Sequence, residues 1–371
     1  MSGSSLQESL SHRGISRREF LKFCSVMAGT LALDTTMAPR IAHALQAPGK
    51  PPVVWLELQD CAGCTESFLR ASRPTAAEIV LDVLAVNYHE TIMAAAGHQA
   101  EAAKEETIKA GGHLLVVEGS IPTATDAAYC TIGGRRATDI LEEAASSAQA
   151  IICVGSCSAF GNIPAANPNP TKAVGVMDLI TDKPIVNLPG CPLNVVNLTA
   201  TVVHYLTFNS LPELDDLKRP LFAHGARIHD NCERRGHFDA GEFVQEWGDE
   251  GHRKGWCLYQ MGCKGPVAYY NCPTVRWNDG TNWPVGAGHG CIACAIPDFW
   301  DLAPMYEPID IYEQKPPVQL PSVEQPAQTI SPVSAGIIGG VAGAAIGAAA
   351  AATARQLSRP EQDQSGPKGE E

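Results

Sequence analysis

Seven side chains that can bind metal lie close together in the second half of the chain, among many glycines and prolines. They are His229, Cys232, Cys257, Cys263, Cys272, Cys291 and Cys294. Thiolates and imidazole suit iron–sulfur clusters or zinc. Seven such groups fill one four-ligand site and one three-ligand site. Because a structural zinc site takes four ligands each time, the remaining three favour iron–sulfur chemistry.

The first half of the chain alternates short apolar runs with helical stretches. The runs are Val53–Leu56, Ile79–Val86, Leu114–Val117, Ile151–Val154 and Ile185–Leu188. The helical stretches include His98–Ala110, Ala137–Ala148 and Leu193–Thr207. This alternation predicts a parallel sheet that is covered by helices on both faces.

Four more cysteines follow the predicted strands. Cys61 and Cys64 come after the first strand, Cys157 after the fourth and Cys191 after the fifth. The carboxyl ends of parallel strands are where open α/β sheets bind ligands. We therefore expect the four thiolates to hold one 4Fe–4S cluster. Gly63, Gly155, Gly161 and Gly190 are expected to let the backbone approach it closely.

The alternative interpretation of Cys61 and Cys64 is a redox-active pair or half of a zinc site. That interpretation leaves Cys157 and Cys191 unexplained. A disulfide framework is disfavoured because a chain of 371 residues with 13 cysteines needs no such staples. A net charge of −13 and the lack of a basic patch argue against a nucleic-acid partner.

The N-terminal residues 1–44 have the three parts of an export signal. Arg17 and Arg18 precede a weakly apolar run, and Ala42-His43-Ala44 fits a small-residue cleavage site. The arginine pair resembles the twin-arginine signal, which serves proteins exported in the folded state. The alternative is a chance pair of arginines in an unstructured N-terminus.

The segment Val333–Ala354 contains no charged residue and is long enough to cross a membrane once. Its glycines recur four residues apart, which favours close packing against another helix. Arg355 and Arg359 suit a cytoplasmic carboxyl end, and residues 355–371 are expected to be disordered. The alternative is a flexible tail rich in alanine and glycine.

Taken together, the motifs resemble those of the small subunits of nickel–iron hydrogenases over nearly the whole chain. The matching stretches are Asp60–Ser67, Gly155–Gly161, Pro189–Pro192, Ile228–Arg235, Gly255–Cys257, Cys263–Pro266, Asn271–Thr274 and Gly290–Cys294. The signal and the C-terminal apolar segment are similar to those of the membrane-attached uptake enzymes.

The resemblance implies three clusters and assigns their ligands. Two 4Fe–4S clusters and one 3Fe–4S cluster are expected. A proximal 4Fe–4S cluster would be held by Cys61, Cys64, Cys157 and Cys191. A medial 3Fe–4S cluster would be held by Cys272, Cys291 and Cys294, with Pro284 where some relatives carry a fourth cysteine. A distal 4Fe–4S cluster would be held by His229, Cys232, Cys257 and Cys263.

The fold class expected is α/β. A flavodoxin-like parallel-sheet domain (45–215) would carry the proximal cluster. An irregular iron–sulfur domain (216–325) would follow, then a linker and transmembrane helix (326–354). The function implied is electron relay from H2 oxidation in a nickel–iron large subunit to an integral membrane acceptor. A cytochrome b and a quinone-reducing subunit both fit that acceptor. The expected location is the periplasmic side of the cytoplasmic membrane.

Several residues are open to two interpretations. Glu66 lies on a proton path near the subunit interface or is a carboxylate at a helix start. Cys153 and Cys130 are expected to be structural, and Cys24 to leave with the signal. Oxygen-tolerant relatives have two extra cysteines where this chain has Gly63 and Asn162, so an enzyme inhibited by air is expected.

Two other functions compete with the hydrogenase. One is a quinone-reductase subunit of the respiratory-complex type, which shares the first cluster site. The other is an exported binding module stabilised by disulfides or zinc.

Overall fold

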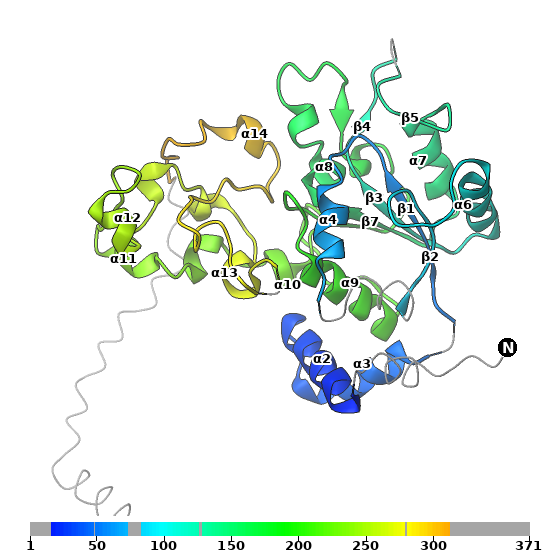
Figure 1. The fold of residues 1–371 in the computed structure, drawn as a ribbon, viewed down its shortest axis with the longest axis horizontal. Coiled ribbons are helices and arrows are strands. Elements are labelled where there is room, and N and C mark those ends of the chain that lie inside the picture. The colour runs from blue at the N-terminus through cyan, green and yellow to red at the C-terminus, as the bar shows by residue number, and fades with distance from the viewer. Residues whose placement is uncertain (1–15, 48, 73–82, 126–127, 279, 312–371) are drawn as a thin grey trace, which may run out of the picture. The chain divides into compact units, whose positions relative to one another are not determined.

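A five-stranded parallel sheet forms the centre of the first half of the chain (Figure 1). The structure, a computed structural model, describes residues 16–47, 49–72, 83–125, 128–278 and 280–311. The strands are β1 (Pro52–Glu57), β2 (Ala85–His89), β3 (Leu114–Glu118), β7 (Ala150–Val154) and β9 (Ile185–Leu188). Their order in the sheet is β2-β1-β3-β7-β9 and every neighbouring pair is parallel. This is the flavodoxin-like order, so the predicted α/β class is confirmed.

Four of the five predicted strands are confirmed to within one or two residues, and the second is misplaced. The run Ile79–Val86 was expected to form it, but β2 begins at Ala85 and ends at His89. Residues 79–82 lie outside the described part. Polar Asn87 and His89 hid this strand: Asn87 is exposed and donates to Thr107, whereas His89 is buried and stacks on Trp55.

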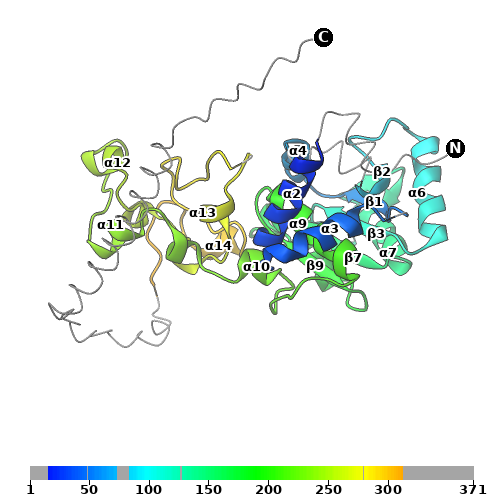
Figure 2. The ribbon, with the colours of Figure 1, turned by 90° about the horizontal axis from the view of Figure 1, so that it is seen from below.

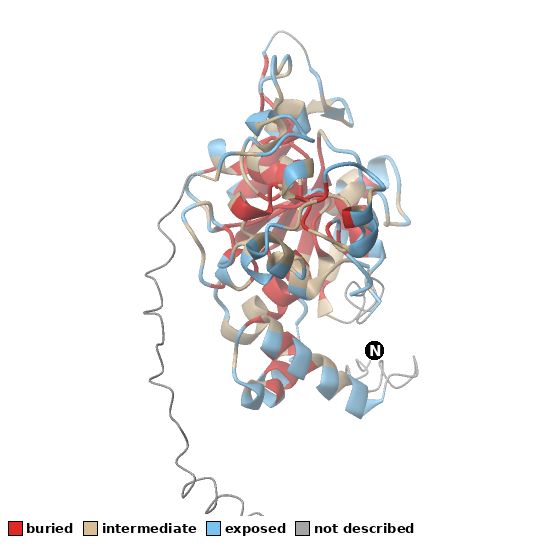
Figure 3. Cartoon of the chain, turned by 90° about the vertical axis from the view of Figure 1, so that its left-hand side faces the viewer, coloured by how far each residue is buried: buried red, intermediate tan, exposed pale blue. Residues whose placement is uncertain are grey.

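The strands bury both faces, as the predicted sheet requires. Alternate residues such as Val54 and Leu56 pack with helices α6 (His98–Ala110) and α7 (Ala137–Ser146). Their neighbours Val53 and Trp55 pack on the other face with α4 (Gly63–Leu69) and α9 (Val195–Phe208). Figure 3 shows the sheet as the most continuously buried part of the chain.

Short elements complete the first half around this sheet. They are β4 (Ile121–Pro122), β5 (Thr131–Ile132), β6 (Arg135–Arg136), α8 (Gly155–Phe160), η3 (Ile163–Ala165), β8 (Ala173–Val174) and η4 (Val176–Asp178). Strand β4 pairs with β8, and β5 pairs with β6. Of the non-ligand cysteines, Cys153 is fully buried in β7, and Cys130 packs against the core just before β5, so their expected structural roles fit.

The N-terminal segment forms a pair of helices against the domain. Helix α2 (Arg17–Thr30) begins with a capping box between Ser16 and Glu19. A short turn η1 (Thr35–Met37) leads into α3 (Ala38–Leu45). Both helices share an apolar core with α9, beside which they lie in Figure 2.

The second half has little regular structure, as expected. Its elements are α10 (Leu221–His224), η5 (Ile228–Asn231), α11 (Arg235–Asp239), α12 (Glu250–Lys254), η6 (Tyr259–Met261), η7 (Gly265–Val267), α13 (Cys272–Val275) and α14 (Phe299–Leu302). Between residues 216 and 311, position 279 apart, the chain contains no strand longer than an isolated bridge. Its core joins aromatic and aliphatic side chains to Cys272 and Cys291.

All described residues belong to one compact unit, which ends at Ile311. The predicted transmembrane segment Val333–Ala354 and the tail 355–371 lie outside the described residues. Within the described ranges, no helix has the length and apolar character needed to span a membrane.

Candidate functional site

The first set of candidate ligands lies at the carboxyl edge of the sheet. Cys61 is exposed in the loop after β1, and Cys64 is buried in α4. Cys157 lies in α8, directly after β7, and Cys191 follows β9. The sheet thus brings together four residues that are up to 130 positions apart in sequence.

Contacts among the sulfurs show how close this set is. The amide Nδ2 of Asn162 donates to Cys157 Sγ at 3.1 Å and lies 3.7 Å from Cys191 Sγ. A Cβ added at Gly155 would collide with Cys64 Sγ, and one added at Gly63 would lie 3.1 Å from Cys61 Sγ. Gly63 and Gly155 therefore give the close approach that was expected.

Gly161 and Gly190 allow close contacts within the loops, and their expected approach to a cluster stays a prediction. A Cβ at Gly161 would lie 2.7 Å from Ala165 Cβ, and one at Gly190 would lie 2.7 Å from the carbonyl oxygen of Pro192. Both glycines also have positive φ. They permit tight backbone turns beside the site, and their nearest neighbours are backbone and side-chain atoms of the loops, not ligand sulfurs.

Burial makes thiolates at this edge unfavourable without a cation. Burial and the carboxylate of Glu118 raise the pKa of Cys64 well above its usual value. Burial raises the pKa of Cys157 to about 12, and burial also raises the pKa of Cys191. As thiolates, Cys64, Cys157 and Cys191 therefore need positive charge from a bound metal centre to persist here.

The second set surrounds a small cavity of about 20 Å³ in the irregular half. Its lining includes His229 of η5, Cys232 directly after it, Cys257, and Cys263 between η6 and η7. Burial raises the pKa of Cys257 to about 11, and also raises those of Cys232 and Cys263. Burial, with Arg235 nearby, lowers the pKa of His229, which favours the neutral imidazole that binds metal.

The third set lines a larger cavity of about 450 Å³. Cys272 of α13, Cys291 and Cys294 contribute to its wall, and Pro284 lies in the same wall. Burial raises the pKa of each of these thiols, that of Cys294 to about 11. Within the wall, proline thus occupies a position from which a fourth thiolate would face the cavity.

The three sets are joined in a row, with the third in the middle. Cys191 of the first set lines the same cavity as Cys294 of the third. Ser156 Oγ donates to the carbonyl of Cys294 and accepts from Gly190 N at 2.9 Å. On the other side, Cys291 N donates to Cys263 Sγ of the second set at 3.2 Å. The arrangement provides a relay of three neighbouring sites.

The spacing of the sulfurs does not suit single ions. Zinc with four thiolates at about 2.3 Å places its sulfurs roughly 3.8 Å apart. Over the described ranges, the one group of three or more possible ligand atoms all within 4.8 Å of one another is Glu57, Asp60 and Glu118. The cysteine sets are wider than that, as a polynuclear cluster requires. All 13 cysteines lie in the described ranges and none forms a disulfide, which contradicts the disulfide alternative.

Two residues at the first set were not identified as site residues from the sequence. Glu118, buried at the end of β3, accepts hydrogen bonds from Cys64 N and Thr65 N, both at 2.9 Å. Asn162 was noted only as a position without cysteine. A carboxylate directly after a buried strand, beside the cysteine loop, was the available signal for Glu118; the sequence held no comparable signal for the Asn162 hydrogen bonds.

Glu66 and the arginine pair lie in the first turns of helices α4 and α2. Glu66 lies in the first turn of α4, lines the mouth of the larger cavity and pairs with Arg70 at 2.8 Å. Its side chain is 60% exposed. This position fits both interpretations of Glu66. Arg17 and Arg18 are exposed at the start of α2.

Two protein-family models match this chain, one in each half. Residues 224–307 match the family model for the C-terminal part of the NiFe/NiFeSe hydrogenase small subunit. Residues 61–205 match the model "NADH ubiquinone oxidoreductase, 20 Kd subunit". The first model covers the second and third ligand sets and the other covers the first set.

Whole-chain relatives extend this similarity. The uptake hydrogenase small subunit of Azotobacter vinelandii is 48% identical over 88% of this chain and 90% of its own. The quinone-reactive Ni/Fe-hydrogenase small chain of Wolinella succinogenes is 47% identical over 81% of this chain and 86% of its own. The Ni-Fe-Se hydrogenase structure from Desulfomicrobium baculatum has a TM-score of 0.66 and 37% identity, covering 70% of this chain and 100% of that one. On this identity and coverage, the chain belongs to the small subunits of nickel–iron hydrogenases.

Proposed function

We propose that this chain relays electrons from H2 oxidation in a nickel–iron large subunit to an acceptor in the membrane. The observation that carries the proposal is the row of three ligand sets, in which Cys191 neighbours Cys294 and Cys291 neighbours Cys263. No nickel-binding set is proposed for this chain. Its residues hold and insulate carriers, and the partner subunit supplies the reaction centre.

The residues fit two 4Fe–4S clusters and one 3Fe–4S cluster. The first set offers four thiolates and would form the proximal site. The second set offers three thiolates and a neutral imidazole and would form the distal site, where electrons leave. The third set offers three thiolates with Pro284 in the wall, which suits a medial cluster lacking one iron. These clusters supply one-electron carriers whose potentials depend on cluster type, hydrogen bonds to sulfur and exposure.

We also propose that the chain is exported folded by the twin-arginine route and held at the periplasmic face of the membrane. The exposed Arg17 and Arg18 support a signal, and the apolar segment 333–354 supports an anchor. The quinone-reactive relative from Wolinella succinogenes supports a membrane electron acceptor. A cytochrome b and a quinone-reducing subunit both meet this requirement.

The test is a metal and spectroscopic count on the complex purified without air. We expect about 11 iron atoms and about 12 acid-labile sulfides in this chain, since the 3Fe–4S cluster keeps four sulfides. The oxidised protein should give a 3Fe–4S electron paramagnetic resonance signal. Replacing Pro284 with cysteine should remove that signal and add about one iron. A colourless complex, or zinc in place of iron, would contradict the proposal.

The quinone-reductase alternative is supported by the family match over residues 61–205. That match contains the first ligand set and ends before the other two. The alternative predicts a single cluster and no H2-dependent reduction of the iron. Bleaching of the visible absorption under H2, together with three resolved redox steps, separates the two functions.

A further inference from the structure

Helix α9 has apolar side chains on two faces and therefore needs two partners. Leu198 and Val202 face the sheet, in the core that contains Trp55. Ala200 and Val203 face the other way and are buried with residues of α2 and α3. A helix that is apolar on both sides exposes a hydrophobic stripe whenever one partner leaves.

The N-terminal helices cover this stripe with their own apolar face. Cys24, Met27 and Ala28 of α2 are at most 3% exposed. On α3, Ile41 is fully buried and Leu45 is 6% exposed. At the edge of the contact, the guanidinium of Arg40 lies 4.9 Å from the centre of the Phe208 ring.

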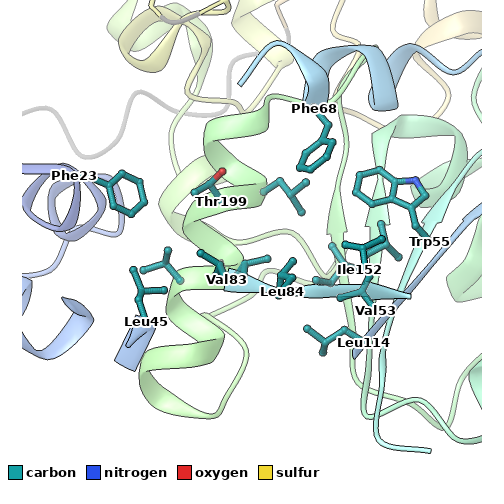
Figure 4. A pocket seen from close by; sticks show the side chains of 15 residues that line it. Phe23, Leu45, Val53, Trp55, Phe68, Val83, Leu84, Leu114, Ile152 and Thr199 are labelled. Carbon is teal, nitrogen blue, oxygen red and sulfur yellow. The ribbon is translucent and has the colours of Figure 1, made fainter. Parts of the chain in front are cut away.

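The contact between the helices and the domain is apolar. Phe23 and Leu45 reach toward α9 and the residues before β2, next to Val83 and Thr199 (Figure 4). A cavity of about 30 Å³ remains between these side chains and those of the sheet, such as Trp55. Residues 17–45 are thus docked on the domain and not merely tethered to it.

Within the expected signal, the arginine pair is exposed, whereas the cleavage site lies in a docked helix. Arg17 and Arg18 are exposed. The expected cleavage site Ala42-His43-Ala44 lies inside α3, where Ala42 is 5% exposed, Ala44 is half-buried and His43 is exposed. The helix and the docked face, rather than complete burial, keep the Ala44–Leu45 bond from the extended form that a peptidase needs. Proteases act on segments that have opened locally, so a helical and docked site is protected.

We propose that residues 17–45 form a latch on α9 that withholds the cleavage site while leaving the arginine pair accessible. This role of the latch rests on the proposed export function. Its release lets a membrane-bound peptidase use one water to hydrolyse the Ala44–Leu45 peptide bond. That step leaves a carboxyl group on Ala44 and an amino group on Leu45, and uncovers the stripe on α9.

The experiment compares three variants of the full-length chain, purified with its large subunit. Ala28→Asp places a charge in the docked face, and Ser25→Asp places the same charge on the exposed face of α2. Ala200→Asp disrupts the docking from the α9 side and leaves the signal sequence unchanged. Hydrogen exchange of residues 17–45 and cleavage by signal peptidase in detergent are measured for each.

We expect slow exchange in the parent chain and in Ser25→Asp. Ala28→Asp and Ala200→Asp should lose that protection and be cleaved at least about tenfold faster, because cleavage follows the population of the open form. Protection of β3 amides shows that the domain still folds. If Ala28→Asp and Ala200→Asp both fail to fold, Arg40→Ala is used instead. It removes only the edge contact and should speed cleavage about two- to threefold.

Free-peptide exchange rates for residues 17–45 in the parent chain would overturn the latch. Equal cleavage rates in Ala28→Asp and Ser25→Asp would also overturn it. A protected segment that signal peptidase never cleaves, even in Ala200→Asp, would instead refute the proposed export role and leave the docking intact. The two failures are therefore distinguishable.

Discussion

The sheet edge and the irregular second half hold their ligands in different ways. At the edge, Cys61, Cys157 and Cys191 follow strands whose two faces are already buried by aliphatic side chains. Between residues 216 and 311, no described helix exceeds five residues. There the proposed ligands Cys272 and Cys291 are themselves part of the core. We therefore expect the sheet to fold without the first cluster, and the second half to depend on its clusters to fold.

Removing the metal should produce the largest difference in stability between the two regions. After anaerobic treatment with a chelator and oxidant, we expect amides in residues 224–311 to lose nearly all protection from exchange. The five strands should keep theirs, because their core contains no cluster ligand except Cys64 at its margin. Hydrogen exchange read by mass spectrometry measures both regions in one sample. Simultaneous loss of protection in β3 and β7 would remove the distinction.

Single ligand substitutions should show the same asymmetry at smaller scale. Cys257→Ser, at a buried ligand of the second set, should lower the free energy of unfolding of that half by about 4 kcal/mol or more. Cys61→Ser, at an exposed loop position, should cost about 1 kcal/mol or less. Denaturant titration followed by tryptophan fluorescence measures both, since Trp55 lies in the first half and Trp256 and Trp283 lie in the second. Equal losses would mean that both regions depend on metal alike.

Acid should weaken the second half through His224. Burial lowers the pKa of this residue from 6.5 to about 3, and its ring stacks on Tyr270 at 4.6 Å. The unfolded chain binds a proton near pH 6.5, but the folded chain does not until about pH 3. The stability from this residue is therefore complete above pH 6.5 and is lost progressively as pH falls toward 3.

At pH 5.5 this loss amounts to roughly 1 kcal/mol. His224→Gln removes the titrating group and keeps a donor for the carbonyl of Tyr269. The difference in unfolding free energy between pH 7.5 and 5.5 should shrink by about that amount in the variant. An unchanged difference would show that other groups dominate the acid sensitivity.

Much of the fold could be predicted because strand and ligand signals coincide in this sequence. Short apolar runs such as Leu114–Val117 that alternate with helical stretches predict central parallel strands. Cysteines directly after such strands are then expected to meet at one edge of the sheet. Strand β2 was misplaced because it contains exposed Asn87, which donates to Thr107, and buried His89, which stacks on Trp55. Hydrophobic patterning carries no information about such partners.

The sequence allowed the candidate ligands to be grouped into three sets, but it did not reveal the groups around them. Short spacings identify Cys291 and Cys294, whereas nothing local links Ser156 to Cys294, 138 residues away. The docking of α2 on α9 was also hidden, since a weakly apolar segment predicts a signal equally well whether or not it packs. Both features arise from tertiary contacts that no single stretch of sequence encodes.

The smallest predicted effect concerns Asn162, whose amide donates to Cys157 Sγ at 3.1 Å and lies 3.7 Å from Cys191 Sγ. Asn162 is 1% exposed, so water cannot replace this donor. Hydrogen bonds to sulfur stabilise the more negative, reduced state of a cluster. Asn162→Leu should therefore lower the potential of the proximal site by about 40 mV, the equivalent of about 1 kcal/mol for one electron. A redox titration followed by electron paramagnetic resonance measures the shift.

Asn169 provides the matched control for this substitution. It lies in the same loop with positive φ, and its amide donates to the backbone carbonyl of Ala173 at 3.1 Å instead of to sulfur. Asn169→Leu should therefore disturb the loop to a similar degree and leave all three potentials unchanged. Equal shifts in the two variants would show that loop strain, and not the hydrogen bond to Cys157, sets the potential. A shift confined to Asn162→Leu, with the medial and distal potentials unchanged, would show that the sheet edge tunes its cluster independently of the irregular half.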